Sequence, residues 1–145
     1  YFDTLDLKTN IIINVDKKRK VKKYLNSNIN FTDKSIDFKN SLELLNKADI
    51  ILDFKNDIHY GLSIRTFEAV GYKKKLITNN ELVKQFDFFN SANIFLLGER
   101  NIDELEEFIA TPYQDLEDYI YEKYSFTNWV KSVFNISPFI KIELK

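Results

Sequence analysis

Residues 48–80 read ADIILDFKNDIHYGLSIRTFEAVGYKKKLITNN and contain one complete unit of the pattern that runs along this chain. Two brief aliphatic runs, 50–52 and 76–77, are bounded by polar residues, which is typical of β-strands. Between them Gly61-Leu62-Ser63 opens a predicted helix in which apolar side chains recur at helical spacing. Strand, helix and strand in this order predict a right-handed crossover whose ligand crevice lies at the carboxyl ends of parallel strands.

The same alternation continues on both sides of this stretch, with strand-like and helix-like segments repeating about five times. The further strands are predicted at 10–15, 29–31 and 94–97, and the helices near 21–25, from Ser35 or Asp37 to 48, at 81–86 and at 103–109. Such alternation is typical of a parallel sheet covered by helices. We therefore predict an α/β fold for residues 1–145: a single Rossmann-like domain, a three-layer sandwich with one parallel sheet of about five strands and helices on both faces.

The last part of the chain breaks this alternation. Residues 115–134 predict one or two helices that pack over the edge of the sheet, the second capped at Ser125. The apolar side chains expected to make that contact are Leu116, Tyr119, Ile120, Tyr124, Trp129, Val130 and Phe134. The tail, 136–145, has alternating character and is left open between a strand and a loose end.

Composition excludes several classes of protein. The 21 basic and 22 acidic residues give a net charge of −1, which disfavours nucleic-acid binding. The absence of Cys removes disulfides, thiolate catalysis and structural zinc, and a single His disfavours a transition-metal site, although carboxylates could still hold Mg²⁺. The longest apolar runs fall far short of the ~20 residues of a membrane-spanning helix. Because the chain lacks Met and begins in the middle of a pattern, we expect it to be a piece of a longer protein.

The start of the central helix is a candidate anion site. A helix that begins directly after a strand presents unpaired N–H groups and the positive end of its dipole. Gly61 permits close approach to the backbone, Ser63 can cap the helix, and Arg65 can add a charge-assisted contact. The alternative is that Gly61 is only a turn residue and Ser63 only a cap, and the sequence favours neither.

Several charged residues near this helix have two interpretations. Glu68 could accept hydrogen bonds from ribose hydroxyls, but the residues alone favour a solvated helix residue. Asp53 closes a buried strand and either points into the crevice or caps the next turn. His59, alone in a loop, is more often incidental. The run 73–75 is predicted to be a solvated turn, because it lies at the opposite edge of the sheet.

Three elements of the chain carry a resemblance to a known family. They are Gly-Leu-Ser-x-Arg-Thr-x-Glu at 61–68, Lys-Lys-Leu-Ile-Thr-Asn at 74–79, and an aromatic Asp-Phe-aromatic-Asn element at 87–90. Together with the strand at 50–53 and residues 126–130, they resemble the C-terminal half of GT-B glycosyltransferases. The likeness is greatest to bacterial enzymes of lipopolysaccharide and capsular-polysaccharide biosynthesis.

The resemblance implies a domain that binds a nucleotide-sugar donor. It places Glu68 at the second Glu of a Glu-x7-Glu motif, which holds the ribose of the donor. The first Glu of that motif is replaced by Tyr60, and the Gly-rich turn after the first strand is replaced by Asp16-Lys17-Lys18. The residues that it implies for the nucleotide site are Gly61, Leu62, Ser63, Arg65, Thr66, Glu68, Asp53 and Asn79.

The resemblance also implies partners and a mode of action. Catalysis in GT-B enzymes takes place between two domains, so this chain would act with an N-terminal domain of the same parent protein and a saccharide or lipid-linked acceptor. No metal or other cofactor is expected, since helix dipole and Arg charge would neutralise the diphosphate. We expect a cytoplasmic location and leave attachment to the inner membrane face open.

Two other interpretations remain. A phosphoacceptor receiver domain is also a five-fold βα sandwich, and Asp53, Thr78 and Asp16 match its strand ends. It requires an acidic pair after the first strand and a Lys after the fifth, where this chain has one acid and Leu97-Gly98-Glu99-Arg100. A domain that has lost its site and is retained only for packing against partners is the third possibility.

Overall fold

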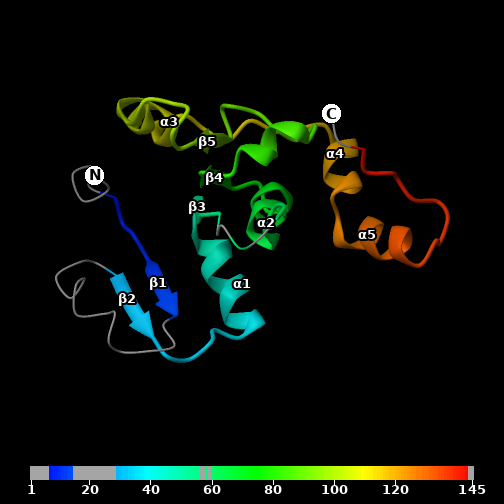
Figure 1. Cartoon of the computed structure of the whole chain (residues 1–145), viewed down its shortest axis with the longest axis horizontal. Coiled ribbons are helices and arrows are strands. Elements are labelled where there is room, and N and C mark those ends of the chain that lie inside the picture. The colour runs from blue at the N-terminus through cyan, green and yellow to red at the C-terminus, as the bar shows by residue number, and fades with distance from the viewer. Residues whose placement is uncertain (1–6, 15–28, 56–57, 59, 144–145) are drawn as a thin grey trace. The chain divides into compact units, whose positions relative to one another are not determined.

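A computed structural model describes residues 7–14, 29–55, 58 and 60–143 of the chain (Figure 1). The chain divides into two compact units, Tyr1–Leu44 and Leu45–Lys145, and each is described by itself. The helix predicted near 21–25, together with Asp16, the basic run that follows it and His59, lies outside the described residues.

The first unit contains two of the predicted strands. β1 (Ile11–Asn14) and β2 (Ile29–Thr32) pair in parallel, with Ile11 opposite Ile29 and Asn14 opposite Thr32. Helix α1 (Phe38–Lys47) begins in this unit and ends in the next. The Asp37 carboxylate accepts a hydrogen bond of 2.9 Å from the Asn40 N–H, so Asp37 is the residue that caps α1.

The second unit is built on three parallel strands in sequential order. β3 (Ile50–Asp53), β4 (Lys75–Thr78) and β5 (Ile94–Leu96) form a sheet in the order β3-β4-β5. Helix α2 (Ile64–Gly71) connects β3 to β4, and the short 3₁₀ helix η3 (Glu81–Gln85) lies between β4 and β5. All residues of β4 and β5 are buried, as expected for strands of a parallel sheet.

The α/β class with parallel strands is confirmed, but the described residues do not form the predicted single sheet of about five strands. Five parallel strands are divided between a two-stranded sheet, β1-β2, and a three-stranded sheet, β3-β4-β5. An apolar run shows that a strand is buried but contains no information on which strand lies beside it. The α/β class therefore follows from the pattern, and the strand partners do not.

The elements after β5 agree with the prediction in order and position. They are the 3₁₀ helix η4 (Ile102–Glu104), α3 (Leu105–Ala110), α4 (Asp118–Lys123) and α5 (Phe126–Val133). Ser125 caps α5 as predicted, since its side chain accepts a hydrogen bond of 3.0 Å from the Asn128 N–H. Residues 136–143 of the tail belong to no strand.

The core of the second unit is rich in aromatic rings. The rings of Phe67, Phe86, Phe88 and Tyr124 lie with their centroids 4.9–6.1 Å apart. Between two of these residues, Asp87 accepts hydrogen bonds of 2.6 Å from Lys123 Nζ and from the Tyr124 hydroxyl. The Asp87 carboxylate therefore links the end of α4 to the segment that follows η3.

The expectation that both C-terminal helices pack over the sheet is only half correct. Leu116, Ile120 and Tyr124 pack against the core cluster, but Trp129 and Phe134 are 54% and 70% exposed. α4 therefore contributes to the core, whereas the aromatic side chains in and directly after α5 point away from it. The spacing of apolar residues correctly predicted that α5 is a helix. It did not predict whether the apolar side of that helix is buried.

The prediction of a solvated turn at 73–75 is wrong for Lys75. Lys75 is 4% exposed, and its ammonium donates hydrogen bonds to the carbonyl oxygens of Phe108 and Thr111 at the end of α3. Burial lowers the pKa of Lys75, and the nearby charge of Arg100 acts in the same direction. A cation at the carboxyl end of a helix is favourable, and here it satisfies carbonyls that have no partner within the helix.

Candidate functional site

The end of β3 and the start of α2 are joined through one carboxylate. Asp53, the last residue of β3, lies in register with Thr78 at the end of β4. Its Oδ2 atom accepts hydrogen bonds from the Ser63 hydroxyl at 2.6 Å and from the Thr66 hydroxyl at 3.0 Å. Thr66 is fully buried, so this arrangement fixes the amino end of α2 against the carboxyl end of the sheet.

The backbone at the start of α2 is open. Ser63 is the N-cap of α2, and its hydroxyl oxygen accepts a hydrogen bond of 3.1 Å from the Arg65 N–H. Gly61 has φ +117° and no atom within 4 Å of where a Cβ would lie, so the turn requires glycine for its backbone conformation and leaves space beside it. Within the described ranges, no acceptor is bonded to the N–H of Ile64, which an outside anion could use.

Glu68 faces inward, one turn after the start of α2. Its side chain is 13% exposed and forms an ion pair of 2.6 Å between Oε2 and Nη1 of Arg65. The Arg65 side chain is 42% exposed. An inward carboxylate with one oxygen held by an arginine can still accept hydrogen bonds from hydroxyl groups through its other oxygen.

Two consecutive asparagines, Asn79 and Asn80, follow β4 and bond to the loops around the site. The Asn79 side chain is exposed and accepts a hydrogen bond of 2.7 Å from the Lys55 N–H, which links the loops that follow β4 and β3. Asn80 is buried; its amide donates to the Gly61 carbonyl at 2.9 Å, and its oxygen caps η3 at Leu82. Sequence reasoning missed Asn80, although an asparagine directly before a short helix is a recognised cap signal.

The structure brings most of the predicted site residues together at one edge of the sheet. Asp53, Ser63 and Thr66 form one hydrogen-bonded group, Gly61 is held by Asn80, and Arg65 and Glu68 lie on the first two turns of α2. Leu62 packs against the core, so its side chain does not line the site. Thr66 and Asp53 bond to each other, which gives them a positioning role.

This arrangement suits a ligand with an anionic group and neighbouring hydroxyls. The N–H groups at the start of α2 and the guanidinium of Arg65 attract an anion, although Asp53 places a negative charge nearby that partly offsets them. Glu68 supplies acceptors for hydroxyl groups. Among the residues described, no group of three or more acidic or histidine side chains is placed to hold a metal ion.

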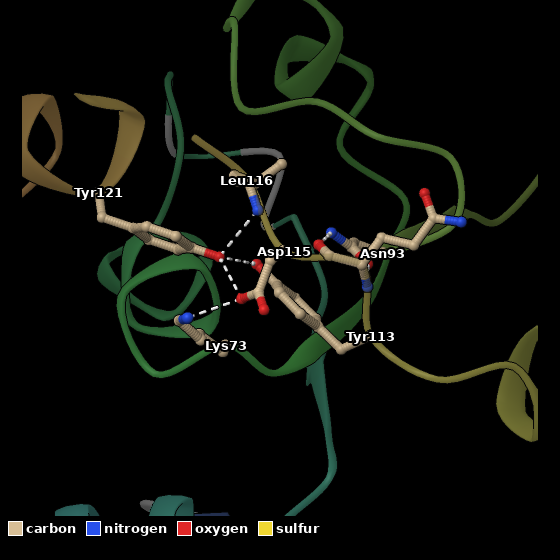
Figure 2. A network of polar contacts seen from close by, with 7 residues as sticks. Lys73, Asn93, Tyr113, Asp115, Leu116 and Tyr121 are labelled. Atoms are coloured by element: carbon tan, nitrogen blue, oxygen red, sulfur yellow. Dashed lines mark hydrogen bonds and ion pairs between the residues drawn. The ribbon is translucent and has the colours of Figure 1, made fainter. Parts of the chain in front are cut away.

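A second polar network lies at the carboxyl end of α2, where the chain turns into β4. Figure 2 shows Asp115 and Tyr121 at its centre, with Lys73 Nζ 2.6 Å from Asp115 Oδ1 and the Tyr121 hydroxyl 3.0 Å from the Leu116 N–H. The Lys73 hydrogen bond lowers the pKa of Asp115, and the same hydrogen bond raises the pKa of Lys73. The network joins Asp115, before α4, and Tyr121 of α4 to the turn between α2 and β4.

Comparisons of this chain with family models, with curated proteins and with solved structures find no match. The likeness to GT-B glycosyltransferases therefore depends on the residues at 61–68, 74–79 and 87–90 alone. In the portion of the chain that the structure describes, no helix combines the length and hydrophobicity that a membrane-spanning segment needs.

Proposed function

We propose that this chain is the nucleotide-sugar-binding domain of a glycosyltransferase that acts in surface polysaccharide or lipopolysaccharide biosynthesis. The observation that carries the proposal is the inward position of Glu68, held by Arg65 one turn inside a helix that begins at an open glycine turn. In this proposal Glu68 accepts hydrogen bonds from the ribose, while the start of α2 and Arg65 bind the diphosphate.

The topology of the second unit supports this proposal. Three parallel strands in sequential order, with a helix crossing from the first to the second, are the arrangement found in each half of a doubly wound sheet. We propose that the whole domain is Rossmann-like, with three layers. Ligands of such sheets bind beyond the carboxyl ends of the strands, where Asp53, Gly61 and Asn79 lie.

The proposal assigns binding to this chain and leaves catalysis to the complete enzyme. Tyr60, which is 99% exposed, occupies the position of the carboxylate that contacts the donor sugar in related enzymes. An N-terminal domain of the parent protein would supply the acceptor site for a saccharide or lipid-linked substrate. The donor diphosphate would be neutralised without a metal, and the protein would act in the cytoplasm.

Calorimetric titration of the purified chain with UDP, GDP and ADP tests the proposal. We expect weak binding of one of these nucleotides, abolished in Glu68→Ala because the ribose loses its acceptor. Glu99→Ala is the matched control, since Glu99 is also an ion-paired carboxylate, bonded to Lys84 far from the site along the chain. Absence of binding for all three nucleotides, or unchanged affinity in Glu68→Ala, would contradict the assignment.

The receiver interpretation makes a different prediction for the same region. A receiver would form a labile aspartyl phosphate on Asp53 when incubated with acetyl phosphate and Mg²⁺. The Ser63 and Thr66 hydroxyl groups both donate to Oδ2 of Asp53, so in a receiver the phosphoryl group would have to be accepted by Oδ1. Labelling of Asp53 would replace the glycosyltransferase proposal.

A further inference from the structure

Asp53 is a carboxylate at the place where the proposed function puts an anion. It is the last residue of β3, and its Oδ2 atom accepts hydrogen bonds of 2.6 Å from the Ser63 hydroxyl and of 3.0 Å from the Thr66 hydroxyl. Ser63 is the N-cap of α2, so the carboxylate is bonded directly to the residue at the positive end of the helix dipole. An anionic ligand at the start of α2 therefore shares that end of the helix with a charge that belongs to the protein.

The carboxylate also reduces the number of hydrogen-bond donors that a ligand can use. The Ser63 hydroxyl donates its single hydrogen to Asp53, and its oxygen accepts a hydrogen bond of 3.1 Å from the Arg65 N–H. The Thr66 hydroxyl is buried and donates to Asp53 as well. Part of the hydrogen-bonding capacity at the start of α2 is thus directed inward, to Asp53, and leaves fewer donors for a phosphate.

The charged side chains of the site do not add up to a positive charge. Asp53 and Glu68 are carboxylates, and Arg65 is a guanidinium with Nη1 2.6 Å from Glu68 Oε2. Lys55 bonds to the site through its backbone N–H, and its side chain is exposed. A site that held a diphosphate by side-chain charge would carry an excess of basic residues. Here the helix dipole and one arginine act against two carboxylates, so each further negative charge on a ligand is repelled by Asp53.

The donor and the product of a glycosyl transfer differ by one such charge. When the sugar is transferred, the bond between its anomeric carbon and the β-phosphate oxygen breaks, and the electron pair stays on that oxygen. The acceptor hydroxyl bonds to the same carbon and loses its proton to solvent or to a base of the complete enzyme. A singly charged phosphate diester thereby becomes a terminal phosphate, which takes a second negative charge above a pKa of ~6.

We propose that Asp53 makes this site selective for the intact nucleotide sugar over the nucleoside diphosphate that remains after transfer. Its carboxylate repels the additional charge of the product and so weakens product binding. The same carboxylate keeps the start of α2 in place through Ser63 and Thr66. This role of Asp53 rests on the proposed function, which supplies the ligand, and it adds discrimination by charge to a site that otherwise attracts any anion.

Calorimetric titration of the parent chain and of Asp53→Asn with matched ligands tests this role. The ligands are UDP, GDP and ADP at about pH 8, each compared with its β-methyl ester, which has the charge of the nucleotide sugar but no sugar ring. An asparagine oxygen can accept both hydrogen bonds, so the substitution removes the charge and keeps the contacts of Ser63 and Thr66. We expect Asp53→Asn to raise the affinity for the free diphosphate about tenfold and that for the methyl ester only about threefold.

Asp115→Asn is the matched control, because Asp115 is a carboxylate at the other end of α2, hydrogen-bonded to Lys73. This substitution should leave the affinities for both ligands unchanged. Salt at ~1 M should reduce the difference between the parent chain and Asp53→Asn, since the Debye length falls to ~3 Å. Circular dichroism verifies that both variants are folded.

Two kinds of failure can be told apart. Equal changes for the free diphosphate and its methyl ester in Asp53→Asn, including no change or a loss for both, would overturn the selective role of Asp53. Asp53 would then act only by holding α2, and the proposed nucleotide site would stand. If no nucleotide binds the parent chain, the proposed function itself fails, and the selective role fails with it.

Discussion

Gly61 precedes α2 and Gly71 is its last residue, and the two glycines differ in backbone conformation. Gly61 has φ +117°, a conformation that side-chain-bearing residues rarely adopt, whereas Gly71 is the last residue of α2 and has helical backbone. At both positions a Cβ atom would have no neighbouring side chain or other atom of the fold within 4 Å. Packing is therefore the same at both positions, and backbone conformation alone determines the effect of a methyl group.

The two substitutions to alanine should change stability in opposite directions. Gly61→Ala should lower the free energy of unfolding by about 1 kcal/mol or more, because alanine is strained at this φ. Gly71→Ala should leave it unchanged or raise it by up to about 1 kcal/mol, since alanine restricts the unfolded chain and favours the helix. Urea denaturation of both variants measures the difference. Equal effects would show that the turn at Gly61 relaxes without cost.

Lys75 is buried, although it belongs to a run of three lysines that the sequence predicts to be exposed. In the run 73–75, Lys73 pairs with Asp115 at the surface, whereas Lys75 is buried and bonded to two carbonyl oxygens. A charge run in a sequence predicts solvation, because most lysines are exposed. Lys75, however, is the first residue of β4, a strand in which every residue is buried, so its side chain lies inside the protein.

At the scale of secondary-structure elements, two buried asparagines attach irregular segments to the fold. The amide of Asn93, which is labelled in Figure 2, donates to the Gln114 carbonyl at 2.7 Å, and its oxygen accepts from the Gln114 N–H at 2.8 Å. Asn128 pairs with Ile140 in the same way, at 2.8 and 2.7 Å. In each case a side-chain amide pairs with both backbone groups of a residue that belongs to no helix or strand. The segments at 111–116 and 136–143 are thereby held without a sheet.

Replacing either asparagine by alanine should release its own segment and leave the other in place. Asn93→Ala should raise amide hydrogen exchange in 111–116, and Asn128→Ala should raise it in 136–143, each with a loss of about 2–3 kcal/mol in local opening free energy. Exchange measured by mass spectrometry distinguishes the segments. Each variant is the control for the other. A general loss of protection across β3, β4 and β5 in either variant would contradict the local character of the contact.

At the scale of the whole molecule, stability in acid should depend on the contact between α4 and the segment after η3. Burial alone would raise the pKa of Asp87, but the hydrogen bonds from Lys123 and Tyr124, together with the Lys123 charge, outweigh it and hold the pKa below its ordinary value. A carboxyl group whose pKa is lowered by folding stabilises the protein above its unfolded pKa of ~3.9. That contribution is lost as the pH falls from this value through the folded pKa.

Asp87→Asn should therefore destabilise the protein at neutral pH and have a smaller effect in acid. We expect a loss on the order of 2–3 kcal/mol at neutral pH, because the Lys123 side chain, 7% exposed, would keep its charge without a carboxylate. Below about pH 4 the difference from the parent protein should shrink as Asp87 is protonated. Urea denaturation at both pH values measures it. Glu99→Gln, which breaks the exposed pair with Lys84, should cost less than about 1 kcal/mol.

The order and type of the elements could be predicted from the sequence because they depend on local properties. Brief aliphatic runs such as 50–52, the helical spacing after Ser63 and the cap at Ser125 are each set by residues within a few positions of one another. The candidate site could be proposed for the same reason: Asp53 ends one strand, and Ser63 and Glu68 lie at the cap and in the second turn of the helix that follows it.

Tertiary structure decided everything that depends on which distant residues meet. The division of five strands between two sheets, the burial of Lys75, the role of Asn80 and the outward face of α5 all depend on contacts between segments far apart in sequence. Periodicity specifies that a helix or strand has an apolar side, since that side follows from spacing alone. It does not specify what covers that side, because the free energy of burial depends on neighbours that only the folded chain brings together.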